Sequence, residues 1–80
     1  MNIEDVIEKF KINLSNADFE TIGCFEQKQE IQKYLLKEDY REISRILEDV
    51  YIKAKNQDFE NIELLADLKS MSENLVRLTR

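Results

Sequence analysis

The sequence contains no histidine, no proline and no tryptophan, and it has a single glycine and a single cysteine. Histidine is the commonest general acid-base residue and the commonest nitrogen ligand for metals, so the usual catalytic pairs and the Glu-x-x-His motif of di-metal helical bundles are both excluded. One glycine is also too few to build a glycine-rich phosphate loop. We therefore expect no enzymatic activity, no cofactor and no bound metal.

The scarcity of chain-breaking residues bears on the fold as well. Strands joined by tight turns need more glycine, proline or Asn-Gly pairs than this chain offers. Hydrophobic residues make up 42% and charged residues 36% of the 80 positions, which is typical of a folded helical domain and unlike a disordered chain. The composition predicts a single all-α domain that spans residues 1–80.

Membrane and secretion signals are missing too. No stretch approaches the ~18 consecutive apolar residues of a membrane span, and the first five residues are acidic where a signal peptide would be basic. Small secreted domains usually carry several disulfides, whereas Cys24 is alone. We expect a cytoplasmic protein that does not bind membranes, in which Cys24 is a small buried hydrophobe. The alternative is a reactive thiol or an intermolecular disulfide.

Apolar residues at helical spacing define four segments that include all four phenylalanines. In chain order, their stripes are Ile3, Val6, Ile7, Phe10 and Leu14; Phe19, Ile22 and Phe25, resuming at Ile31, Leu35 and Leu36; Ile43, Leu47, Val50 and Ala54; and Phe59, Ile62, Leu65, Leu68, Met71, Leu75 and Leu78. Short connections favour antiparallel neighbours. The pattern predicts a small antiparallel four-helix bundle.

The expected helix boundaries depend on a few polar residues. Asn2 is placed to cap the first helix, and Asp39 and Glu42 have the spacing of a capping box at the start of the third. Gly23 and the five polar residues 26–30 interrupt the second stripe. We expect a kink or a break near residues 23–30, and a fourth helix that starts around residues 56–58.

The motif Asn-x-Asp-Phe-Glu-x-Ile occurs at residues 16–22 and again at 56–62, and a shift of forty residues also aligns many hydrophobic positions. We interpret the halves as two related helical hairpins, residues 1–37 and 38–80, with an internal repeat of ~40 residues. Two explanations stay open. Either the chain is a true duplication, or two unrelated hairpins obey the same helix-start chemistry, in which Asn or Asp caps a helix and acidic residues fill its first turn.

Two groups of side chains are candidates for binding a partner. Glu60, Glu63 and Asp67 have the spacing of one helix face with no basic residue among them, which indicates either a solvated face or a docking strip for a basic partner. Tyr34 and Tyr51 fall off the main apolar stripes, as Ile12 and Ile52 do. Tyrosine is frequent at interface centres, so this pair marks either a partner surface or the edge of a wide core.

The formal net charge is −5, and the twelve basic residues are scattered along the sequence without forming a patch. Because Lys and Arg dominate affinity for phosphates, we expect no direct binding of nucleic acid, and a helical DNA regulator would need a basic face. The leading hypothesis is a small acidic protein-binding module, a stoichiometric inhibitor such as a toxin-immunity protein, an antitoxin or a phage-encoded inhibitor, with a basic protein as its partner. The alternative is a structural or assembly module, either a homodimer or a helical adaptor subunit.

Overall fold

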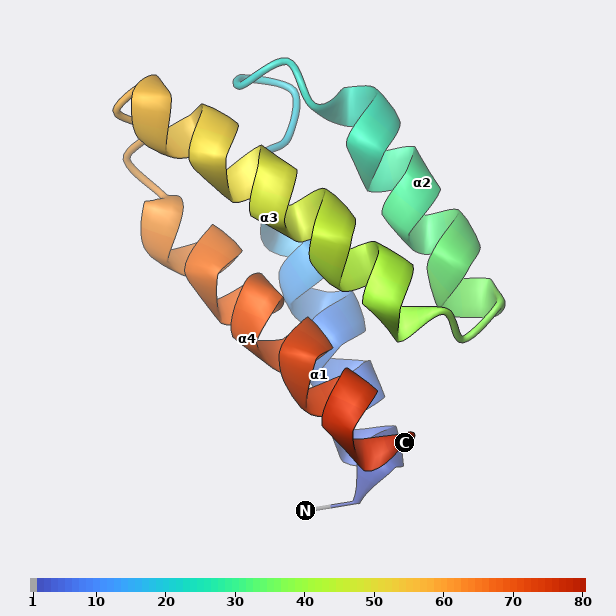
Figure 1. The fold of residues 1–80 in the computed structure, drawn as a ribbon. Helices are drawn as coiled ribbons and strands as arrows, with labels where there is room; N and C mark the ends of the chain where they lie inside the picture. Colours follow the sequence, from blue (N-terminus) through green and yellow to red (C-terminus); the bar gives the residue numbers. More distant parts are fainter. Residues whose placement is uncertain (1) are drawn as a thin grey trace.

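The computed structural model describes residues 2–80 and contains four α-helices, with no strand among those residues. The helices are α1 (Ile3–Asn16), α2 (Phe25–Leu36), α3 (Tyr40–Asn56) and α4 (Ile62–Leu78) (Figure 1). They pack into a compact bundle with a radius of gyration of 11.7 Å. The all-α four-helix fold predicted from the scarcity of Gly and Pro is confirmed.

The expected caps form at two of the helix starts. The side-chain oxygen of Asn2 accepts a hydrogen bond from the N–H of Asp5 at 2.9 Å, and Asp39 accepts from the N–H of Glu42 at 3.3 Å. Only this half of the predicted capping box is made, because the Glu42 carboxylate binds Arg45 and the N–H of Asp39 donates to the last turn of α2. The orphan amide that Glu42 was expected to satisfy is thus already occupied.

The second apolar segment differs from the expectation. Residues 17–24 form a turn, and α2 begins only at Phe25, after which it continues unbroken through the polar residues 26–30. The break therefore lies before the helix. Phe19 and Ile22 are almost fully buried, but they reach the core from the turn, whereas Phe25 is 45% exposed. Its assignment to the core stripe was wrong because the helix starts there in a new register.

The repeated motif also has a different role from the one expected. Asn16 and Asn56 are the last residues of α1 and α3, so each copy of the motif ends a helix and leads into a turn. The fourth helix starts at Ile62, and its preceding residue Asn61 makes no side-chain capping bond. In the first copy, the Asp18 carboxylate accepts from the N–H of Thr21 at 3.2 Å and so stabilises the turn.

The C-terminal ends of α2 and α3 close with the same turn. Glu38 and Asp58 take left-handed conformations, with φ of 57° and 52°. In both turns the N–H of the next residue donates to a carbonyl oxygen five positions earlier, at 3.0 and 3.1 Å, which is the Schellman arrangement. Glycine is the usual residue at such a position, and Gly23, the only glycine of the chain, has φ of 71° and occupies the same place in the turn before α2, where the N–H of Cys24 donates to the carbonyl oxygen of Phe19 at 2.8 Å.

Helices α3 and α4 form the central antiparallel pair of the bundle. Helix α2 packs against α3 and α1 packs against α4, so the spatial order is α2, α3, α4, α1. The short connection at residues 37–39 makes α2 a neighbour of α3, while the longer turn at 17–24 separates α1 from α2. The second half of the chain is therefore a packed hairpin, and the two helices of the first half flank it.

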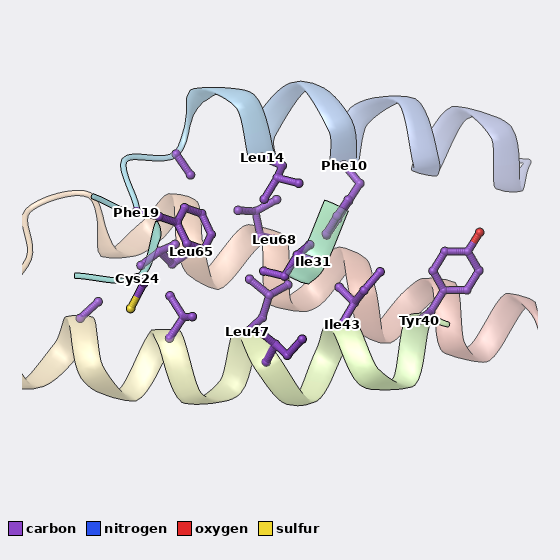
Figure 2. Close-up of a cluster of buried hydrophobic side chains, with 14 of the residues drawn as sticks. Phe10, Leu14, Phe19, Cys24, Ile31, Tyr40, Ile43, Leu47, Leu65 and Leu68 are labelled. Carbon is purple, nitrogen blue, oxygen red and sulfur yellow. The ribbon is translucent and has the colours of Figure 1, made fainter. Parts of the chain in front are cut away.

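The core lies between all four helices (Figure 2). Its largest fully buried side chains include Phe10, Ile31, Leu47 and Leu68, which come from the four different helices. Phe19 and Cys24 add side chains from the turn before α2. The predicted stripes of α1, α3 and α4 are confirmed at their central positions.

Candidate functional site

The three predicted acidic residues are all exposed, but they do not share one helix. Glu63 and Asp67 lie one turn apart on α4, whereas Glu60 lies in the turn before it, because α4 begins at Ile62. Within residues 2–80 none of the three carboxylates lies within salt-bridge distance of a basic group. The strip is thus bent at its first residue and is uncompensated by neighbouring charge.

The turns that follow α1 and α3 meet at this end of the bundle and extend the acidic surface. Asp18, Asp58 and Glu60 line one groove of about 390 Å³, and the two turns are joined by a hydrogen bond from Gln57 Nε2 to the carbonyl oxygen of Ile22 at 3.4 Å. We call Asp18, Asp58, Glu60, Glu63 and Asp67 the acidic end. Sequence analysis missed Asp18 and Asp58, although their shared place in the repeated motif was a signal for them.

The charge of the acidic end is maintained by local chemistry. Hydrogen bonds from the Thr21 hydroxyl and N–H lower the pKa of Asp18, so this carboxylate is ionised at neutral pH. Two lysines lie nearby, and the positive charge of Lys28 also contributes to the lowered pKa of Asp18. Lys28 Nζ donates to the carbonyl oxygen of Ala17 at 3.3 Å, and Lys53 Nζ donates to that of Gly23 at the same distance.

The two candidate tyrosines are both half-buried by contacts within the chain. The Tyr51 ring lies 5.5 Å from the Nζ of Lys69, which also pairs with Glu48 at 2.5 Å. Tyr51 therefore belongs to the junction between α3 and α4. Tyr34 on α2 is covered by Lys37, whose Nζ lies 5.8 Å from the ring centroid. The structure brings Glu60 together with Asp18 and Asp58, and it leaves each tyrosine in a separate cation–π contact.

Several large apolar side chains remain exposed. Ile12 and Ile52, which occupy equivalent positions in the repeat, are 54% and 48% exposed on α1 and α3. Leu36, the last residue of α2, is 89% exposed, and Leu78 at the end of α4 is 52% exposed. Their assignment to the core stripes was wrong, because each is the last residue of its helix and extends beyond the packed part of the core. These four residues lie on four different helices, so their exposure does not define one continuous apolar stripe.

A second charged surface lies between α3 and α4, and it contains every arginine of the chain. We call it the arginine groove. It has a volume of about 520 Å³ and is lined by Arg41, Ser44, Arg45, Glu48, Glu73, Val76, Arg77 and Arg80. The view that the basic residues form no patch was made from their spacing along the sequence, and the hairpin brings them together. Its signal was the hairpin register, since residues equally far from the turn at 57–61 lie opposite each other.

Ion pairs organise part of the arginine groove. The Arg45 guanidinium donates a hydrogen bond to the Glu42 carboxylate, and this bond lowers the pKa of Glu42. Arg45 also lies 3.6 Å from an oxygen of Asp49. Arg77 Nη2 donates to the side-chain oxygen of Asn74. Within residues 2–80, neither Arg41 nor Arg77 lies within 4.0 Å of a carboxylate.

The remaining chemistry of the described chain is limited. Cys24 is buried, and this burial raises the pKa of its thiol, so it is a poor nucleophile in the folded state. Among residues 2–80 no three potential ligands of the Cys, Asp and Glu types are grouped to hold a metal ion. None of the helices formed by these residues is both long and apolar enough to span a bilayer.

Comparison with known proteins adds no family to this description. No known protein family, curated protein sequence or solved structure matches the chain. The functional argument therefore starts from the two charged surfaces, the acidic end and the arginine groove.

Proposed function

We propose that this protein is a small protein-binding module that acts as a stoichiometric inhibitor, as toxin-immunity proteins, antitoxins and phage-encoded inhibitors do. Its partner is a basic protein, and the acidic end is the docking surface. The observation that supports this proposal is the exposed set of carboxylates contributed by both copies of the repeated motif and by α4, of which Glu60, Glu63 and Asp67 form no ion pair within residues 2–80. The module has no catalytic chemistry of its own in this proposal.

The geometry of the acidic end favours recognition of a protein surface. Its carboxylates lie in the two loops that follow α1 and α3 and in the first two helical turns of α4. Because they are spread over this surface, they match a patch of basic side chains better than a single small cation. Complementary charge of this kind mainly raises the association rate and excludes wrong partners. A fast association suits an inhibitor that must occupy its target before the target acts.

The test compares two variants that carry the same net charge. Glu60→Gln/Glu63→Gln/Asp67→Asn removes three charges from the acidic end, and Glu4→Gln/Glu8→Gln/Glu30→Gln removes three exposed charges from α1 and α2. A protein captured from the source lysate is identified by mass spectrometry and purified, and its association rate with each variant is measured at low salt. We expect the first variant to associate at least ~10-fold more slowly than the parent.

The control variant should lose far less, because its charges lie away from the docking surface. Raising the salt concentration should bring the parent and the first variant together, since exposed charges are screened beyond ~10 Å at 0.1 M salt. Equal association rates for both variants at low salt would contradict docking through the acidic end.

The exposed apolar residues favour a second candidate function, an assembly module that works as a homodimer or as a helical adaptor subunit. Ile12 and Ile52 are the specific observation, because equivalent exposure on α1 and α3 offers two similar surfaces for association. Analytical ultracentrifugation over a wide range of concentrations tests the homodimer. A dimer that Ile12→Ser/Ile52→Ser dissociates would support it, and a monomer at every concentration would exclude it.

A further inference from the structure

The basic residues that line the arginine groove are all arginines. All four arginines of the chain line it, and none of the eight lysines does. A guanidinium is a planar fork that binds two oxygens of a carboxylate or phosphate at once, whereas an ammonium acts as a point charge. The composition of the groove is therefore suited to planar anions.

The guanidinium groups also retain donors for a ligand. Each carries five N–H donors. Arg45 is oriented by Glu42 and Asp49, and Arg77 is oriented by a single bond to Asn74. Arg41, on the facing helix, makes no ion pair within residues 2–80. The groove thus contains one guanidinium that is neutralised by ion pairs, that of Arg45, and two that have no carboxylate of the described chain within 4.0 Å, those of Arg41 and Arg77.

The walls of the groove also contain negative charge, which restricts the class of anion that can bind there. Glu48 is paired with Lys69 at 2.5 Å, and Glu73 lies on α4 one turn before Arg77. With the partners of Arg45 and Glu48 included, the four arginines and Lys69 stand against four carboxylates, those of Glu42, Glu48, Asp49 and Glu73. The groove is therefore weakly positive, and within residues 2–80 its unpaired positive charge lies at Arg41 and Arg77. A continuous phosphate backbone would meet both glutamates, which would repel its neighbouring charges. Separate carboxylates, spaced by neutral residues, can approach the arginines alone.

We propose that the arginine groove binds the Asp and Glu side chains of an acidic segment in a partner protein. This inference rests on the proposed function as a protein-binding module and assigns that module a second docking site. Val76 and Ser44 provide an apolar and a hydroxyl contact between the arginines. A volume of about 520 Å³ accommodates a few side chains of an extended peptide.

The arginine side chains themselves report on the test, because the protein has only four Nε–Hε signals in its NMR spectrum. The ¹⁵N-labelled protein is titrated in separate experiments with an end-blocked eight-residue peptide in which Glu alternates with Ser, with inorganic phosphate and with a single-stranded oligonucleotide. We expect the peptide to shift the signals of Arg41 and Arg77. The acidic-end variant Glu60→Gln/Glu63→Gln/Asp67→Asn should bind the peptide as the parent does, which separates this test from that of the proposed function.

Two exposed arginines are replaced to measure the contribution of the groove. Arg41→Gln/Arg77→Gln should raise the peptide Kd at least ~10-fold, and Lys9→Gln/Lys11→Gln, with the same net charge, should change it less than ~2-fold. Arg41→Lys/Arg77→Lys keeps the charge and removes the fork, so it too should weaken binding. Circular dichroism confirms that each variant remains helical.

Three results would overturn the inference. One is equal peptide binding by the parent and Arg41→Gln/Arg77→Gln. Another is tighter binding of phosphate or of the oligonucleotide, which would assign the groove to phosphate groups. The third is a shift of the arginine signals on raising the protein concentration without peptide, which would make the acidic end of a second copy the occupant.

Discussion

Truncation of Leu68 is a direct test of the packing between the central helices. This residue of α4 is fully buried in the core between the helices (Figure 2). Leu68→Ala removes buried methyl groups and leaves a cavity that the neighbouring helices only partly fill, so the expected loss in free energy of unfolding is ~2–5 kcal/mol. A domain of this size has a total of about 4–12 kcal/mol, so the variant is expected to lose a large share of its stability.

Urea denaturation followed by circular dichroism measures this loss. With a slope near 1 kcal/mol per molar urea for a small domain, the midpoint should fall by ~2 M or more. Leu36→Ala is the matched control, because it makes the same chemical change at a side chain that is 89% exposed. Its midpoint should differ from that of the parent by no more than ~0.5 M urea, which at this slope is a change of about 0.5 kcal/mol in the free energy of unfolding. Equal midpoints for the two variants would refute the assignment of the α4 core face.

The turns supply two further predictions. Gly23→Ala should destabilise the protein by about 1–2 kcal/mol, because φ is 71° and a Cβ strains the left-handed backbone, while Glu38→Gly should stabilise it by up to ~1 kcal/mol; denaturation midpoints that move in the same direction would contradict this account. Thr21→Val should raise the pKa of Asp18 towards its ordinary value, measured by NMR titration of the Asp18 carboxyl carbon in the parent and in the variant. Since the folded pKa is the lower one, the stabilisation from Asp18 is present above the ordinary pKa of aspartate and is lost as the pH falls through the folded value.

Prediction from the sequence succeeded for the helices that have both a capping residue at their start and an apolar stripe along their buried face. Asn2 and Asp39 cap the starts of α1 and α3, and the apolar stripes of these helices supply their buried faces, so local chemistry and burial agree. The start of α2 was misplaced because Phe19 and Ile22 have helical spacing while they reach the core from a turn. A buried turn residue and a buried helix residue leave the same mark in a hydrophobic pattern.

The candidate site was predictable only in part. The acidic residues of α4 were found because they are close in sequence, whereas Asp18 joins them through the meeting of two turns. The arginine groove was missed for the same reason, since Arg41 and Arg77 are brought together only by the packing of α3 on α4. The choice between a docking face and a solvated face depends on the partner, and the sequence of one chain does not contain it.

The placement of the two charged surfaces changes the meaning of the net charge. Figure 1 shows that the turn between α3 and α4 and the C-terminus lie at opposite ends of the molecule, which is 34 Å long. The acidic end includes that turn, and the arginine groove extends to Arg80 at the C-terminus. The screening length at physiological salt is ~8 Å, so neither end is felt at the other. A partner approaching either end meets the local charge rather than the total of −5. The protein therefore presents surfaces of opposite charge at its two ends, as the proposed docking of a basic surface at one end and of an acidic segment at the other requires.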